Sequence, residues 1–221
     1  MTKKQNTAQQ PENQDFIASF LMGIVNFCKK NKQGVITAAV ILVVAAIIGS
    51  SYSAYQNKVA EDSWAAYYTA QVVMSTQGEQ AGFKHLDDLA AKYKGTPAAQ
   101  YAMLLKADVL YANENFAQAA EVYNLLADSK NETVYTAANL SRSAALQAAG
   151  EYHMAADGMN EFIKNNPNSF ALPQAYLTLA MSQELAGKKE EALASYKYLL
   201  ENHTKSYFGT LAKEKIEQLN K

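Results

Sequence analysis

The chain has 221 residues, a formal net charge of −1, four prolines, ten glycines and abundant Ala, Leu, Glu and Lys. Such a composition, with few helix breakers, predicts an all-α fold. The only arginine is Arg142, and a nucleic-acid groove needs clustered Lys and Arg, so we expect no nucleic-acid binding.

The first 32 residues divide into two parts. Residues 1–14 are mostly Gln, Asn, Thr and Lys, which predicts a disordered cytoplasmic tail. Residues 15–32 form an amphipathic and basic juxtamembrane segment, in which apolar residues recur at helical spacing before three lysines. These are Phe16, Ile17, Phe20, Leu21, Ile24, Val25, Phe27, then Lys29, Lys30 and Lys32. The segment either lies in the inner headgroup layer, docks on another membrane protein, or merely extends the anchor that follows.

Residues 33–57 are 25 consecutive uncharged positions with an apolar centre. This length fits a transmembrane helix. The head before it carries a charge of +3 and the remainder −4, and basic flanks tend to stay in the cytoplasm. We therefore expect a single-pass membrane protein with a cytoplasmic N-terminus and a C-terminal domain on the outer side, in a periplasm or an equivalent lumen.

The alternative for this run is a cleaved signal peptide, with Ser51-Tyr52-Ser53 before Ala54 as its cleavage site. A basic leader of 32 residues is long for such a signal, and both readings place the body on the same side. The body contains no cysteine, since the only one is Cys28, which agrees with an oxidising compartment.

Three small residues, Ala45, Gly49 and Ser53, are spaced four apart along this span. Small residues at such spacing allow close contact between helices in lipid. They are equally compatible with an ordinary Ala-rich span.

The body, residues 58–221, repeats itself. Ala119, Ala155 and Ala192 lie 36 and 37 residues apart, and each is followed four positions later by a large residue: Tyr123, Met159 and Tyr196. This pairing predicts helical hairpins whose helices approach closely at the alanine. Gly150 and Gly187 fall at the turn before the second helix, whereas Glu114 takes that place in the first repeat, so we expect its turn to be built differently.

This pattern resembles the tetratricopeptide repeat, with units at 97–131, 132–168 and 169–205 and flanking helices at 58–94 and 206–221. The resemblance implies a solenoid whose first helices line a concave groove. The groove positions are Tyr101, Leu104, Asp108, Tyr111, Leu140, Ala144, Gln147, Gln174, Leu177, Met181 and Glu184. Two interpretations are open: these residues bind a protein partner, or several of them simply pack between repeats. The cations with which some such domains clamp a carboxylate are absent from these positions.

Catalytic and metal-binding patterns are missing from the sequence. His85, His153 and His203 are far apart, and no His-Glu-x-x-His or Gly-x-Ser-x-Gly motif or phosphate-binding Gly loop occurs. Adjacent carboxylates such as Asp87-Asp88 point apart on a helix. We expect no enzyme, cofactor, metal or small-molecule substrate. A hydrolase would need a nucleophile with a base at a recognisable spacing, and none is found.

The layout, with Phe27 to Lys32 leading into the span and repeats reaching the C-terminus, resembles the YfgM-like family of bacterial inner-membrane proteins. The resemblance implies an accessory of the Sec translocon that meets periplasmic chaperones and unfolded exported chains. Its span would act as a tether that raises effective concentration. The alternative is an envelope-assembly or cell-division scaffold that recruits peptidoglycan or outer-membrane machinery.

Overall fold

The computed structural model describes residues 12–221, with side chains from residue 18. In this part of the chain α-helices are joined by short turns and loops, as the all-α prediction requires. Its helices are α1 (Glu12–Lys30), α2 (Lys32–Gln77), α3 (Glu79–Lys92), α4 (Pro97–Ala112), α5 (Phe116–Asn124), α6 (Glu132–Ala148), α7 (Tyr152–Asn165), α8 (Leu172–Leu185), α9 (Lys189–Asn202) and α10 (Tyr207–Leu219). Most of the predicted disordered tail, residues 1–14, lies outside the described residues. The chain divides into two compact units, residues 1–58 and 59–221.

The first unit holds α1 and the N-terminal part of α2. A turn at Asn31 separates the two helices, and the Asn31 N–H donates to the Phe27 carbonyl at 2.9 Å. Helix α2 contains the predicted span, and it is long and apolar enough to cross a membrane. The proposed cleavage site at Ser51 to Ala54 lies inside this continuous helix.

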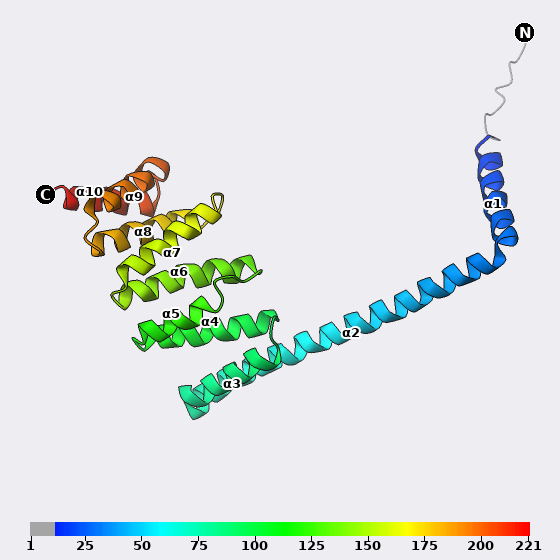
Figure 1. Ribbon diagram of the computed structural model, residues 1–221, viewed down its shortest axis with the longest axis horizontal. Helices are drawn as coiled ribbons and strands as arrows, with labels where there is room; N and C mark the ends of the chain where they lie inside the picture. The colour runs from blue at the N-terminus through cyan, green and yellow to red at the C-terminus, as the bar shows by residue number, and fades with distance from the viewer. Residues whose placement is uncertain (1–11) are drawn as a thin grey trace, which may run out of the picture. The chain divides into compact units, whose positions relative to one another are not determined.

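The second unit is a series of helix pairs. The end of α2 packs on α3, and α4 with α5, α6 with α7, and α8 with α9 form the following hairpins, before α10 (Figure 1). The first helices of successive hairpins also touch, α4 with α6 and α6 with α8. This arrangement is the predicted stack of hairpins.

The repeated small and large residues lie in the core of this unit. Ala119, Ala155 and Ala192 are completely buried, and the large residues four positions on, Tyr123, Met159 and Tyr196, are also buried. A small side chain lets the two helices of a hairpin approach, and the large one fills the space beside it. The close packing of such an interior is what excludes larger replacements.

Three turns inside the hairpins have the same construction. Gly150 and Gly187 have φ of 84° and 75°, a left-handed conformation that glycine adopts without steric cost. Glu114 has φ of 61° and the same bonding pattern: Asn115 N–H donates to Leu110, as Glu151 does to Leu146. The expectation that this turn is built differently is therefore wrong. The backbone bonds of the hairpin impose the turn, and a non-glycine residue is held in it.

Two helix starts in this unit are capped by hydroxyl side chains. The hydroxyl of Thr96 accepts from the Ala99 N–H at the start of α4, and Ser206 accepts from Gly209 at the start of α10. Each cap satisfies one of the backbone donors that a helix end leaves unpaired. Outside the caps, Lys106 of α4 forms an ion pair with Asp87 of α3 at 2.7 Å.

Candidate functional site

Three of the predicted groove residues line one hollow between α4, α5 and α6. Asp108 and Tyr111 come from α4 and Ala144 from α6, and Tyr123 and Ser141 complete a space of about 310 Å³. The stacking of α4 on α6 places Asp108 and Tyr111 beside Ala144, which lies more than 30 positions further along the chain. Sequence reasoning assigned Tyr123 to the core and did not include Ser141.

Two residues that line this hollow are joined by a hydrogen bond. The buried Tyr123 hydroxyl donates to the Asp108 carboxylate. Burial, together with the neighbouring negative charge of Asp108, raises the pKa of Tyr123 above its ordinary value. The phenol stays neutral and donates, so the carboxylate is already engaged. Tyr111 remains 37% exposed, with its ring 5.2 Å from that of Phe116.

An aromatic cluster continues this surface onto α2. The Tyr101 ring lies 5.8 Å from that of Trp64, and Trp64 lies 5.5 Å from Tyr67 and 6.3 Å from Tyr68. Tyr68 and Val72 are each 60% exposed, whereas Leu104, also predicted for the groove, packs against the core. The sequence placed Trp64, Tyr67 and Tyr68 in a flanking helix. Their helical spacing gave no signal that they adjoin Tyr101.

The predicted groove residues nearer the C-terminus form hydrogen bonds and packing contacts mainly with other residues of the repeats. The Gln147 amide donates to the Thr178 carbonyl at 2.9 Å and to the Ser182 hydroxyl at 2.7 Å, which joins α6 to α8. Glu184 accepts from the Tyr196 hydroxyl at 2.7 Å and pairs with Lys215 at 3.1 Å.

The other three predicted residues of α8 also have internal contacts. Leu177 is buried in the C-terminal core cluster. Met181 packs on the C-terminal core cluster. Gln174 is exposed, and its amide reaches the Thr178 hydroxyl at 3.4 Å. On the α2–α4 side, Tyr68 and Tyr111 keep exposed aromatic rings.

The predicted contact residues of the span, Ala45, Gly49 and Ser53, are all exposed along α2. A Cβ added at Gly49 would meet nothing within 4 Å. Close helix contact through these residues stays a prediction.

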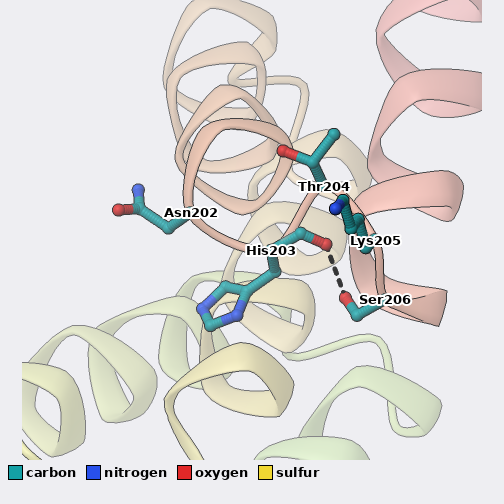
Figure 2. Close-up of a pocket in the computed structure, with 5 residues that line it drawn as sticks. All are labelled: Asn202, His203, Thr204, Lys205 and Ser206. Atoms are coloured by element: carbon teal, nitrogen blue, oxygen red, sulfur yellow. Dashed lines mark hydrogen bonds between the residues drawn. The ribbon is translucent and has the colours of Figure 1, made fainter.

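A second hollow lies at the turn between α9 and α10. Figure 2 shows its five lining residues, which are consecutive: Asn202, His203, Thr204, Lys205 and Ser206. The Ser206 hydroxyl donates to the His203 carbonyl at 2.7 Å, so this feature belongs to the cap of α10. Across the described residues, no three His, Cys, Asp or Glu side chains gather as a metal site would require.

Comparisons with known proteins address the fold and the family. A search of curated proteins gave no match. A crystal structure described as a Podosopora anserina kinesin light chain with nearly identical TPR-like repeats is similar in fold, with a TM-score of 0.53. It is 13% identical and the similarity covers 70% of this chain and 83% of that one. The family model of the tetratricopeptide repeat-like domain matches residues 26–221. The protein is thus a repeat scaffold for protein–protein interaction and belongs to the tetratricopeptide repeat-like domain family.

Proposed function

We propose that this protein is a membrane-anchored scaffold, in which α2 holds the repeats beside the bilayer and α4 presents the surface for a protein partner. The observation that carries the proposal is the exposed aromatic surface of α2 and α4. Tyr68 and Tyr111 are exposed, and the rings of Trp64 and Tyr101 pack against each other beside them. Tyrosine and tryptophan contribute much of the binding energy at protein interfaces, because they bury large areas at small entropic cost.

The chemistry of this surface favours an apolar polypeptide segment. The predicted groove positions include no lysine or arginine, so a C-terminal carboxylate would find no cation there. Asp108 is already engaged by Tyr123. An extended or partly unfolded chain with exposed apolar side chains fits such aromatic surroundings. This supports exported chains in transit, and the chaperones that receive them, as the class of partner.

Three observations support a retained anchor with the repeats at the periplasmic face of the inner membrane. The basic residues Lys29, Lys30 and Lys32 precede the span, which favours a cytoplasmic N-terminus. Tyr52 and Tyr55, both exposed, follow the apolar run where headgroups would begin. The matched family region begins at residue 26 and includes α2, which supports a retained anchor.

Crosslinking in native membranes, with identification of partners by mass spectrometry, tests this function. The wild type is expected to recover translocon subunits, periplasmic chaperones and exported chains. Tyr111→Ala is expected to lose most of them. Tyr207→Ala removes a tyrosine that is 72% exposed on α10, away from the proposed surface, and serves as the matched control.

Two outcomes would contradict parts of the proposal. Equal recovery from wild type and Tyr111→Ala would exclude the α4 surface as the binding site, provided that the circular dichroism of the variant is unchanged. Recovery of peptidoglycan or outer-membrane enzymes alone would exclude the translocon role and favour the envelope-assembly alternative.

A further inference from the structure

Helix α1 carries a large apolar surface. Within its described part, six bulky apolar side chains between residues 20 and 27 are each exposed by 45% or more. They are Phe20, Leu21, Met22, Ile24, Val25 and Phe27. Each Å² of apolar surface removed from water stabilises a protein by about 25 cal/mol, and these exposed side chains would forgo that stabilisation in water. The helix therefore needs an apolar environment.

The small and polar residues Ser19, Gly23 and Asn26 follow one narrow line that ends at Lys30, whereas Lys29 at the C-terminal end of the helix lies off this line. Ser19, Gly23, Asn26 and Lys30 are spaced by four, three and four positions, and a helix turns by about 100° per residue, so they fall within about 60° of one another. The six bulky residues occupy about 220° of the remaining circumference by the same geometry. This is an amphipathic helix with an unusually wide apolar face.

The helix is too short to cross a membrane. Residues 16–28 are its uncharged part, which at 1.5 Å per residue is roughly 20 Å long, against about 30 Å for the hydrocarbon. Lys29 and Lys30 then end the helix, and a turn at Asn31 leads into α2. When α1 lies along the surface, Lys30 stays on the polar side, and the long side chain of Lys29 at the helix end can extend to the headgroups.

Lipid fits this face better than a partner helix does. Membrane helices that pack closely use small residues at the contact, but Gly23 lies on the polar line, and the apolar face is made of bulky side chains. A single protein surface would cover one side of the helix only, whereas acyl chains can surround all of a wide face. Lys29, Lys30 and Lys32 are complementary to anionic headgroups.

We infer that α1 lies flat in the headgroup layer, on the side from which α2 enters, with its apolar face on the acyl chains of anionic lipid. This inference rests on the membrane anchoring of α2 proposed above. Membrane association would then have two elements, a spanning helix and a surface helix, separated by the turn at Asn31.

Depth measurements on the full chain in vesicles of phosphatidylcholine and phosphatidylglycerol test the inference. Cys28→Ser removes the only cysteine, and an environment-sensitive fluorophore is then attached to single cysteines. Leu21→Cys reports the apolar face of α1 and Asn26→Cys the polar line. Val40→Cys reports the span. Quenching is measured with aqueous iodide, and with lipids that carry a spin label near the headgroup or at the chain end.

The label at Leu21 is expected to be quenched by iodide several-fold less than the label at Asn26, and most strongly by the shallow spin label. The label at Val40 should respond to the deep one. Equal iodide quenching at Leu21 and Asn26, with Val40 protected, would overturn the inference and leave the anchor intact. Iodide access at Val40 would instead refute the anchor itself.

Two further results concern the ligand. Protection of Leu21 from iodide without quenching by either lipid would indicate a protein contact, and would overturn the inference. Protection that is equal in vesicles of phosphatidylcholine alone, or unchanged in Lys29→Gln/Lys30→Gln, would overturn the role assigned to anionic headgroups.

Discussion

The three left-handed turns of the hairpins allow two opposite substitutions to be compared: glycine replaced at one turn and introduced at another. Gly187 has φ of 75° and a Cβ added there would meet nothing within 4 Å, so Gly187→Ala introduces only backbone strain. A non-glycine residue in this conformation costs about 1–2 kcal/mol, and the lower freedom of alanine in the unfolded chain offsets about 0.5–1 kcal/mol. The expected net loss in the free energy of unfolding is about 1 kcal/mol.

Glu114 offers the reverse experiment. It has φ of 61° and the same turn hydrogen bonds, so Glu114→Gly removes strain of the same size. We expect a gain of about 0.5–1 kcal/mol, after the greater freedom of glycine in the unfolded chain is subtracted.

Urea titrations and thermal melts of the full chain in detergent micelles, both followed by circular dichroism, measure the two changes. Each should shift the thermal midpoint by about 2–4 °C, in opposite directions. Gly187→Asn is the matched control and should lose less than Gly187→Ala, because asparagine tolerates the left-handed region better. The reasoning would be refuted if Glu114→Gly and Gly187→Ala shifted stability in the same direction.

Three other predictions concern stability. Burial, followed by a hydrogen bond to a carboxylate, raises the pKa of both Tyr123 and Tyr196 above the ordinary tyrosine value of 10.0. Above pH 10 these two tyrosines are therefore deprotonated in the unfolded chain and still protonated in the folded one. The protein should therefore lose stability as the pH rises past 10, and Tyr123→Phe or Tyr196→Phe should flatten this dependence in urea titrations. Gly209→Ala would drive a Cβ into the His203 carbonyl and should cost about 1–3 kcal/mol by the same assay, with no loss disproving the close approach. Thr96→Ala removes the cap of α4 and should lower the thermal midpoint through a loss of about 1 kcal/mol, whereas an unchanged midpoint would show that the cap is dispensable.

Local patterns determined the secondary structure and the core of this protein. The spacing of Ala119, Ala155 and Ala192 predicted the hairpins, because a helical period and a turn signal are properties of short segments. The uncharged run at residues 33–57 likewise predicted a helix apolar enough to span a membrane. These features need no knowledge of distant contacts.

Tertiary packing decided which groove positions are free. Gln147 and Glu184 look like binding residues along the chain, yet their partners Ser182 and Lys215 lie 35 and 31 positions away and engage them internally. Trp64 contacts Tyr101 only because the C-terminal part of α2 belongs to the same unit as α4. The turn at Glu114 follows the same rule, since the hydrogen bonds of the hairpin impose a conformation that glutamate alone disfavours. A sequence pattern shows which residues share a face, whereas packing between hairpins determines what covers that face.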